Sequence, residues 1–401
     1  MLGFTKDDII EHYYDASIFG SNFDRRFSEA DARIDSARTL SEMYQVIAGP
    51  LLDLQESHTV FIPPFQTTLT RHGWELEMVG DSCFVTAVQP GSDADAKGLS
   101  CGTLIHSVNG LTPSRKVLSQ LDYSTSVLSP ELPVSFTVRE RDGSRGEIEV
   151  CPAILRQGRA VEFMGETGDI AFANYLRDLD QRQDLRHLRL ARVNDELAIW
   201  KLPSFECSRK QIDAAMGKLV GMRSVILDLR SNPGGHAVAL AYLAGYFFDH
   251  DITLCYLDGR SGRDSIVAVH ESDSFKGKVF VLVNSKSNSS AEVFAKTMQI
   301  QHRGIVLGDV TGGMVSKADY FPRKMGAQHV VSYGSYITTA AITMPDSSRL
   351  SGTGVIPDVV TLPRSCDLAE GLDPVLAHAA QMAGVQIDPR RAAELFPIEW
   401  R

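Results

Sequence analysis

Serine residues between an expected strand and an expected helix are the first candidates for chemistry. Four serines occupy the polar stretch 284–290, directly after the apolar run 279–283. That run is rich in β-branched residues and predicts a buried strand, whereas apolar spacing from residue 293 onward is typical of a helix. A helix start offers free N–H groups and partial positive charge, which suit a nucleophile whose reaction creates an oxyanion. A serine-rich loop alone is equally typical of helix caps.

A glycine pair follows a second expected strand. Residues 225–229 are largely apolar, then come Pro233, Gly234 and Gly235, and residues 237–248 have a helical pattern. Glycines at such a junction let the backbone approach a ligand and direct N–H groups toward it. The segment lacks both the Gly-Lys-Ser/Thr of a phosphate loop and the Gly-x-Gly-x-x-Gly of a dinucleotide site. The two strand–loop–helix units, with further alternation to about residue 365, indicate an α/β domain.

Three segments resemble the motifs of one enzyme family. They are 228–235 (Asp-Leu-Arg-Ser-Asn-Pro-Gly-Gly), 287–292 (Ser-Asn-Ser-Ser-Ala-Glu) and 354–358 (Gly-Val-Ile-Pro-Asp). In this order they resemble the C-terminal processing, or tail-specific, serine peptidases and their tricorn-core relatives. The resemblance implies a crotonase-like α/β catalytic domain that cleaves unstructured polypeptides through an acyl-enzyme, with no cofactor and no metal.

The resemblance also implies roles for individual residues. It makes Ser289 the nucleophile and builds the oxyanion hole from the backbone N–H of Gly234 or Gly235 together with that of Ser290. Loss of one oxyanion donor typically costs ~3 kcal/mol of transition-state stabilisation. Glu292, one helical turn past Ser289, is interpreted as a structural residue that caps the helix start or pairs there.

The base that activates the serine departs from the commoner pattern. Many relatives use a lysine 25 residues after the nucleophile, where this chain has Met314, and Lys317 comes three residues late. Ser57 and His58 instead resemble the Ser-His pair of the tricorn-type enzymes. We therefore expect His58 to act as general base in its neutral form, above a pKa near 6.5 if unperturbed. His236, beside the glycine pair, is the second candidate.

A second departure leaves two function classes open. The tricorn-type arrangement expects a glutamate shortly before residue 354, where this chain has Ser351. A hydroxyl can orient a partner but cannot stabilise positive charge as a carboxylate does. The chain is therefore either a serine endopeptidase or a catalytically inactive relative that binds a peptide or hydrophobic ligand in the same cleft.

The length of 401 residues exceeds what one hydrophobic core usually holds, so several domains are expected. We expect an N-terminal helical region over 1–66, in which Pro50 interrupts a helix, a PDZ-like domain over 67–152, a connector over 153–195, the catalytic domain over 196–365, and a C-terminal helical segment over 366–401.

Residues 67–152 alternate like short strands separated by glycine-containing turns, and they resemble a PDZ domain. Such a domain pairs a peptide as an extra strand and holds its terminal carboxylate with backbone N–H groups. Gly73, Trp74 and Leu76 are the expected substrate-binding residues. A scaffold or gate with the same fold is the alternative interpretation.

Charge and hydropathy restrict the partners. A net charge of −10 and a pI near 5.6 argue against nucleic acid, and no apolar run is long enough for a membrane span. The first residues lack the pattern of a signal peptide, so we expect a cytoplasmic protein as the sequence stands, or an extracytoplasmic one if a leader was trimmed. The expected partner is a polypeptide substrate, captured by its C-terminus or elsewhere, and the oligomeric state is left open.

Overall fold

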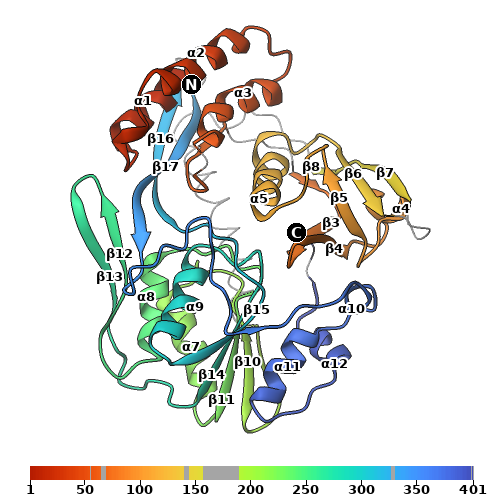
Figure 1. Cartoon of the computed structure of the whole chain (residues 1–401), viewed down its shortest axis with the longest axis vertical. Helices are drawn as coiled ribbons and strands as arrows, with labels where there is room; N and C mark the ends of the chain where they lie inside the picture. Colours follow the sequence, from red (N-terminus) through yellow and green to blue (C-terminus); the bar gives the residue numbers. More distant parts are fainter. Residues whose placement is uncertain are drawn as a thin grey trace.

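The computed structural model describes residues 1–54, 56–64, 69–139, 144–156, 189–326, 330–398 and 400. Figure 1 shows three bodies: N-terminal helices at the top, a β-rich unit at the right, and a larger α/β body below. A long β-hairpin runs from the α/β body up to the helices. In the part of the chain described, no helix is both long and apolar enough to cross a membrane.

The α/β body is built on one largely parallel sheet. Its strand order is β18-β15-β14-β11-β10-β9, and only β9 runs antiparallel to its neighbour. The strands are β9 (Arg189–Arg192), β10 (Leu197–Lys201), β11 (Ser224–Asp228), β14 (Lys278–Val283), β15 (Gly304–Gly308) and β18 (Val359–Val360). Because β11 and β14 are parallel neighbours, the loops that follow them meet at the same sheet edge.

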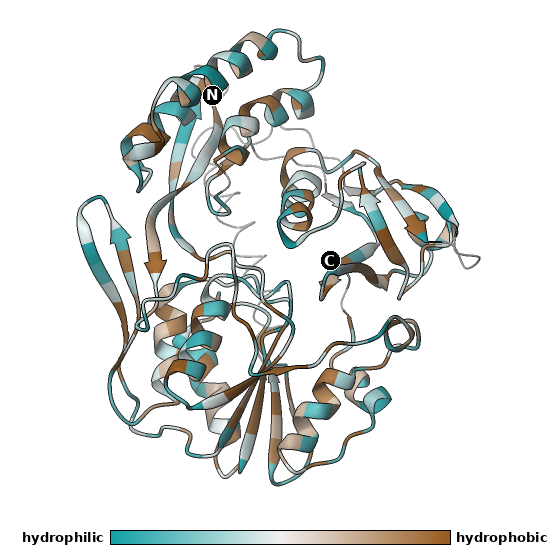
Figure 2. Cartoon of the chain, in the orientation of Figure 1, coloured by the Kyte–Doolittle hydropathy of each residue, from teal (hydrophilic) through white to brown (hydrophobic). Residues whose placement is uncertain are grey.

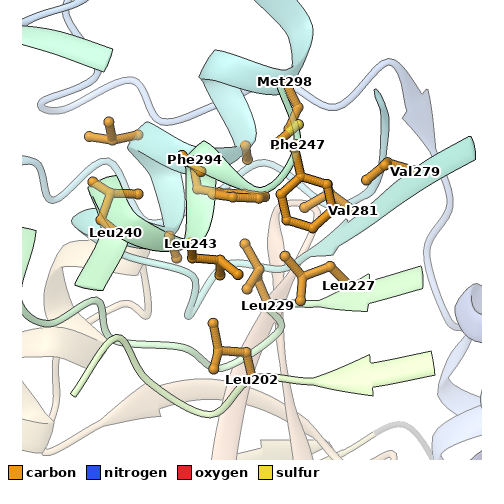
Figure 3. Packing of buried hydrophobic residues seen from close by; sticks show 14 of the residues in the cluster. Leu202, Leu227, Leu229, Leu240, Leu243, Phe247, Val279, Val281, Phe294 and Met298 are labelled. Atoms are coloured by element: carbon orange, nitrogen blue, oxygen red, sulfur yellow. The ribbon is translucent and has the colours of Figure 1, made fainter. Parts of the chain in front are cut away.

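Helices cover both faces of this sheet, which explains why its strands are continuously apolar. One face packs against α7 (Arg209–Leu219), α8 (Ala237–Gly245) and α9 (Ser290–Ile300), and the other against α11 (Pro374–Met382), which contacts α12 (Pro389–Glu394). Figure 2 shows apolar residues concentrated in the central strands. In Figure 3, Phe247 and Phe294 pack edge-to-face above Val281 and Leu229, with ring centroids 5.7 Å apart. The structure confirms the α/β prediction.

A second sheet links the α/β body to the N-terminal helices α1 (Leu2–His12), α2 (Ser21–Ile34) and α3 (Leu40–Leu52). Its order is β1-β17-β12-β13, with β16 also paired to β17. The strands are β1 (Val60–Ile62), β12 (Ile252–Gly259), β13 (Gly262–Ala268), β16 (Ser316–Met325) and β17 (Val331–Thr343). The helices bury Phe61, Tyr333 and Ile337 from this sheet. Because β1 pairs with β17, the turn before β1 lies beside the hairpin of β16 and β17, close to the edge of the α/β body.

One expectation about the N-terminal region needs correction, and the expected connector is described only at its two ends. The expectation that Pro50 interrupts a helix is wrong, because α3 continues through it to Leu52. Pro50 removes one backbone hydrogen bond, and the helix ends two residues after it. The segment 153–195, expected to be a connector, begins with strand β8 (Ala153–Arg156) and contains β9, while residues 157–188 lie outside the described residues.

The β-rich unit is a five-stranded antiparallel sheet of order β3-β4-β5-β6-β7. It contains β3 (Trp74–Val79), β4 (Ser82–Val88), β5 (Leu104–Val108), β6 (Val134–Arg139), β7 (Arg145–Val150), α4 (Asp93–Ala96) and α5 (Arg115–Tyr123). Strand β2 (Leu69–Arg71) pairs with β8 beside it. Within the described residues β3 is an edge strand, and α5 packs against it.

Candidate active site

Ser289 occupies a sharp turn between β14 and α9. Its φ of +54° lies in a region that is unfavourable for residues other than glycine, so the fold holds it there at a conformational cost. Strained strand–turn–helix junctions of this kind expose the nucleophile in hydrolases of another fold. Two contacts tie the loop to the segment after β11: the Ser287 hydroxyl donates to the Leu229 carbonyl at 2.8 Å, and the Ser231 amide donates to Asn284 Oδ1 at 2.8 Å.

Glu292 is fully buried and connects this turn to the loop 311–314. Its carboxylate accepts four hydrogen bonds, from the Ser289 amide at 3.0 Å, the Thr311 hydroxyl at 2.5 Å, the Gly313 amide at 2.8 Å and the Met314 amide at 2.9 Å. Burial raises the pKa of Glu292 to about 7, although each donor favours the ionised form. The expected cap is therefore present, and the same carboxylate also fixes a second loop.

The glycine pair lies directly against the serine turn. A Cβ built on Gly234, whose φ is +100°, would lie 2.6 Å from Ser289 Cβ and 3.0 Å from the Ser290 nitrogen, so only glycine fits. The Gly234 amide already donates to Asn232 Oδ1 at 2.8 Å. Among the hydrogen bonds of the described residues, none is donated by the amide of Gly235 or Ser290. The structure thus leaves two amide donors beside Ser289.

Segment 354–358, the third of the matching segments, contacts the loop 311–314 that Glu292 binds. The Val355 amide donates to the Thr311 hydroxyl at 2.6 Å, and the same hydroxyl donates to Glu292. A Cβ on Gly354 would lie 2.6 Å from the Thr311 carbonyl oxygen. Asp358 accepts a hydrogen bond from the Val306 amide on β15 at 2.8 Å. Segment 354–358 therefore positions the loop that Glu292 holds.

Ser57 and His58 lie in a tight turn between α3 and β1. The Ser57 hydroxyl and His58 Nδ1 are 2.8 Å apart. The next residue, Thr59, is fully buried, and its hydroxyl both donates to Thr338 Oγ1 at 3.1 Å and accepts from the Thr338 amide on β17 at 3.0 Å. Desolvation lowers the pKa of His58 to about 4, below the value near 6.5 of an unperturbed imidazole. The imidazole is therefore neutral at pH 7.

A short path joins this turn to Ser289. The Ser289 amide donates to the Met314 carbonyl at 2.9 Å, and two residues later the Ser316 hydroxyl donates to Glu56 Oε1 at 2.9 Å. Glu56 immediately precedes Ser57. No hydrogen bond joins Ser289 Oγ to a ring nitrogen of His58, although the structure describes both residues. The structure thus brings the two candidates to adjoining segments without direct contact.

Two lysines near the turn of Ser289 form ion pairs with carboxylates. Lys317 is half-exposed on β16 and pairs with Asp319 at 3.1 Å. Lys286, which the sequence analysis did not single out, lines a small cavity with Asn288 and Met314, and its Nζ lies 3.9 Å from Glu75. Met314 itself stands at the position where many relatives have lysine, and its side chain offers no basic nitrogen.

A cavity of about 570 Å³ lies where the three bodies meet. Residues from each body line it: Glu56 and Ser57 from the N-terminal region; Arg115, Lys116, Ser119, Gln120 and Tyr123 from α5; and residues 311–314 and 351–353 from the α/β body. Ser351 is thus on the same wall as Met314. His236 is exposed at the start of α8. Within the described residues there is no cluster of three or more His, Cys, Asp or Glu side chains suited to a metal ion.

The β-rich unit docks onto the α/β body beside this cavity. Arg115 Nη2 lies 3.2 Å from Asp309 Oδ2, and the same oxygen accepts from the Gly80 amide at 2.8 Å. Arg115 also donates to the carbonyls of Val310 and Gly80. The Ser285 hydroxyl donates to the Met78 carbonyl at 2.6 Å. These contacts place the Met78 end of edge strand β3 next to the serine loop.

Two of the three predicted substrate-binding side chains face inward. Trp74 and Leu76 are buried in the core of the β-rich unit, so their side chains are not available to a ligand, and their predicted role in substrate binding rests on their backbone. Gly73 has a φ of +74° and packs so closely against Ser92 that a Cβ would lie 2.5 Å from Ser92 Cβ. Only the backbone of this strand is presented to a ligand. Side chains alternate between the two faces of a strand, so Trp74, Leu76 and Met78 share one face, and this alternation in the sequence predicts that they are buried together.

Comparison with known proteins agrees with the geometry. The model of "Peptidase family S41" matches residues 196–361. The chain is 24% identical over 353 residues to carboxyl-terminal-processing peptidase 1, chloroplastic, of Arabidopsis thaliana, covering 84% of this chain and 66% of the relative. It is 27% identical over 183 residues to a tail-specific protease of Haemophilus influenzae, covering 44% of this chain and 24% of that protein. The chain thus spans less than two thirds of either relative.

Fold comparison extends the similarity over most of the chain. Mature CPAF superposes with a TM-score of 0.64 at 11% identity, covering 92% of this chain and 93% of that one. At this identity the likeness concerns the fold alone. The matched segment contains the glycine pair, the serine turn, Glu292 and segment 354–358. Residues 196–361 therefore match the model of peptidase family S41, and the chain is similar to relatives named as carboxyl-terminal-processing and tail-specific proteases.

Proposed function

We propose that the chain is a serine endopeptidase that cleaves unstructured polypeptides through an acyl-enzyme. The observation that carries this proposal is the pair of uncommitted amides, those of Gly235 and Ser290, beside the strained turn of Ser289. Amide donors arranged before reaction are the part of an acyl-transfer site that stabilises the developing oxyanion. The crotonase-like and PDZ-like descriptions of the two larger units belong to the same proposal.

In this mechanism His58 Nε2 removes the proton from Ser289 Oγ as the oxygen attacks the scissile carbonyl. The oxyanion accepts hydrogen bonds from the amides of Gly235 and Ser290. His58 then donates its proton to the leaving amine, and the peptide bond breaks. Water, deprotonated by His58, hydrolyses the acyl-enzyme and restores Ser289. A neutral imidazole at pH 7 supports the basic role of His58.

The approach of His58 to Ser289 requires substrate to draw the adjoining segments together. Catalytic hydrogen bonds are often long in ligand-free enzymes and shorten when the substrate binds. The wall of the cavity that holds Ser57 and the wall that holds Met314 belong to different bodies, so a small shift between them changes this separation. Lys317 pairs with Asp319, and Lys286 pairs with Glu75. These ion pairs support a histidine rather than a lysine as the base.

The substrate we propose is extended polypeptide, because a cavity of about 570 Å³ admits side chains rather than a folded domain. Edge strand β3 supports pairing of such a segment as an added strand, with its C-terminus toward Gly73 and its preceding residues toward the serine loop. The backbone of β3 supplies this pairing, while the buried Trp74 and Leu76 side chains only shape the strand.

The alternative proposal is an inactive relative that binds peptide or a hydrophobic ligand in the same cavity. Met314 in place of lysine, Ser351 in place of glutamate, and the lack of a Ser289–His58 hydrogen bond among the described contacts favour it. An inactive binder and an enzyme differ in the reactivity of one hydroxyl, which a chemical probe reports directly.

The test is labelling by a fluorophosphonate, which forms a covalent adduct with an activated serine. Intact mass should rise by one adduct in the wild type and remain unchanged in Ser289→Ala. Tandem mass spectrometry of the tryptic peptide that follows Lys286 separates Ser289 from Ser287 and Ser290. Equal labelling of wild type and Ser289→Ala would overturn Ser289 as the nucleophile, and no labelling of either folded protein would favour the inactive binder.

A further inference from the structure

We infer that Asp373 is a positioning residue for the oxyanion hole, which it holds in place through the guanidinium of Arg230. The inference rests on the proposed function, because the loop that Arg230 fixes carries the Gly235 amide of that reaction. Asp373 belongs to the C-terminal segment and lies outside residues 196–361, the part that matches the family model. The C-terminal segment thereby becomes part of the site.

One guanidinium joins two carboxylates at the end of β11. Arg230 donates to Asp228 from Nε at 2.9 Å and from Nη2 at 2.8 Å. Its other edge donates to Asp373, from Nη1 at 2.9 Å and from Nη2 at 2.7 Å. Both pairs are bidentate, so the two carboxylates fix the plane of the guanidinium as well as its position.

This ion cluster is largely removed from water. The Asp228 side chain is fully buried, and the side chains of Arg230 and Asp373 are only 17% and 15% exposed. Lys201 Nζ lies 3.4 Å from Asp228, so two cations face two carboxylates. Ion clusters this buried lose their hydration, and apolar residues of the same size often stabilise a fold as well or better. A requirement for one fixed loop geometry accounts for the charges where stability alone does not.

Asp373 is itself held firmly at the start of α11. Its Oδ1 accepts the Leu376 amide at 2.9 Å and caps the helix, and its own amide donates to the Pro389 carbonyl at 2.9 Å. The helix buries its apolar residues against the parallel sheet, on the face opposite α8 and α9. The carboxylate is therefore a fixed point for the guanidinium.

The chain reverses sharply after Arg230. The Arg230 amide donates to Asp228 Oδ1 at 3.1 Å, and the Asn232 amide donates to the Leu229 carbonyl at 3.2 Å. Ser231, between them, has a φ of +59°, which is unfavourable for a residue other than glycine. Such a turn persists only where its surroundings fix it, and the two carboxylates on the guanidinium supply part of that constraint.

The turn leads directly to the oxyanion donors. The Asn232 side chain is fully buried, and its Oδ1 accepts the Gly234 amide at 2.8 Å. The Asn232 carbonyl accepts the Asn288 amide at 2.9 Å, one residue before Ser289. Displacement of the turn would therefore shift the Gly235 amide and the segment that carries the nucleophile.

Asp373→Asn removes the charge but keeps the shape of the side chain and the helix cap, because asparagine caps helices as well as aspartate does. Its NH₂ group would face the guanidinium, so Arg230 loses at least one acceptor and the turn loosens. We expect kcat to fall on the order of 10-fold with KM within about twofold of wild type, because displaced catalytic groups slow the reaction without weakening substrate binding.

Asp388→Asn is the matched control. Asp388 caps α12 as Asp373 caps α11: its carboxylate accepts the Arg390 amide at 2.9 Å, and proline follows the cap in both helices. Among the described contacts, Asp388 has none with Arg230, so kcat should stay at the wild-type value. Arg230→Gln combined with Asp373→Asn should be no slower than Arg230→Gln alone, because Asp373 acts through that guanidinium.

Hydrogen exchange in the full-length protein is the deciding measurement, because it does not depend on activity. Asp373→Asn should speed exchange in residues 230–236 and 287–292, whereas Asp388→Asn should change neither segment. Thermal unfolding of each variant shows that exchange and kinetics are measured on folded protein. If Arg230→Gln does not fold, Asp373→Asn and its control decide the question without it.

The outcomes separate this inference from the proposed function. Unchanged exchange in both segments, or a change confined to α11, would overturn the role of Asp373. An unchanged kcat in an Asp373→Asn protein that exchanges faster would overturn it too. If exchange changes as expected but wild-type Ser289 does not react with a fluorophosphonate, Asp373 still positions the loop and the peptidase function fails.

Discussion

The Ser289 amide donates to the carboxylate of Glu292 at 3.0 Å, and the same carboxylate receives the amides of Gly313 and Met314. A residue one turn inside α9 thereby sets the geometry of the turn that precedes it. The Ser289 amide is consumed by this contact, so the amides left for an oxyanion are those of Gly235 and Ser290.

Glu292→Gln should disturb this arrangement although the side chain keeps its shape. One carboxylate oxygen becomes an NH₂ group that faces amide donors, so at least one buried donor loses its acceptor. We expect a loss of about 3 kcal/mol in unfolding free energy and at least a tenfold slower reaction with a fluorophosphonate. Chemical denaturation and labelling rates measure both, with Glu394→Gln on the surface as control. Unchanged labelling would contradict the assignment.

The pH dependence of labelling should contain two steps. As the pH falls through about 7, Glu292 takes up a proton and its donors lose an ionised acceptor, so the rate should drop in part. As the pH falls through about 4, His58 becomes charged and the remaining rate is lost, because imidazolium cannot accept a proton. Burial disfavours that charge, which is why the step lies below 6.5.

Labelling rates from pH 3.5 to 8 in wild type and in Glu292→Gln distinguish the two groups. The variant should lose the upper step and keep the one near pH 4. A step near pH 6.5 that persists in the variant would indicate an unperturbed histidine and contradict the lowered pKa of His58.

Gly234→Ala should slow the reaction of Ser289 in addition to lowering the free energy of unfolding. The added methyl group would lie 2.6 Å from Ser289 Cβ, so the turn and the Ser290 amide must shift. Gly221 has a similar positive φ, +82°, with nothing within 4 Å of the added carbon. Gly221→Ala should cost about 1 kcal/mol of stability and Gly234→Ala more because of its clash, and only Gly234→Ala should slow labelling, on the order of 10²-fold. Equal labelling of the two variants would contradict the proposed oxyanion geometry.

Arg115 should couple the β-rich unit to the loop behind the nucleophile. Arg115→Ala removes a largely buried ion pair with Asp309 and two bonds to carbonyl groups. We expect a loss of about 1–2 kcal/mol and faster hydrogen exchange in residues 309–314. Lys116→Ala, next to it on the same cavity, is the matched control. A double-mutant cycle with Asp309→Ala that gives no coupling energy would refute the link.

The sequence indicates the α/β site well because its signals are local. Runs ending at residues 229 and 283 predict neighbouring strands, and parallel strands place the loops that follow them at one edge. The four contacts of Glu292 could not be predicted, since three of its donors lie 19 to 22 residues away on a loop whose path depends on tertiary packing. The lowered pKa of His58 likewise depends on desolvation by tertiary packing, which residue identity alone does not predict.

Other differences also follow from tertiary context. Trp74 and Leu76 alternate with polar residues in a way that predicts one buried face, and the structure buries both side chains. Proline usually breaks a helix interior, but Pro50 stands two residues before the end of α3, so few residues follow it in the helix. Glu56 carries no motif, so its association with Ser57, His58 and Ser316 is visible only when the second sheet joins the N-terminal turn to β16.

The most direct test of the account is the initial rate of hydrolysis of an unfolded protein by wild type, Ser289→Ala, His58→Ala and Lys317→Ala. The account predicts that wild type cleaves, that Ser289→Ala does not, that His58→Ala loses ~10²–10⁴-fold or more, and that Lys317→Ala stays close to wild type because its ammonium pairs with Asp319. An inactive Lys317→Ala beside an active His58→Ala would establish a lysine base, and a wild type no faster than Ser289→Ala would establish a binding protein.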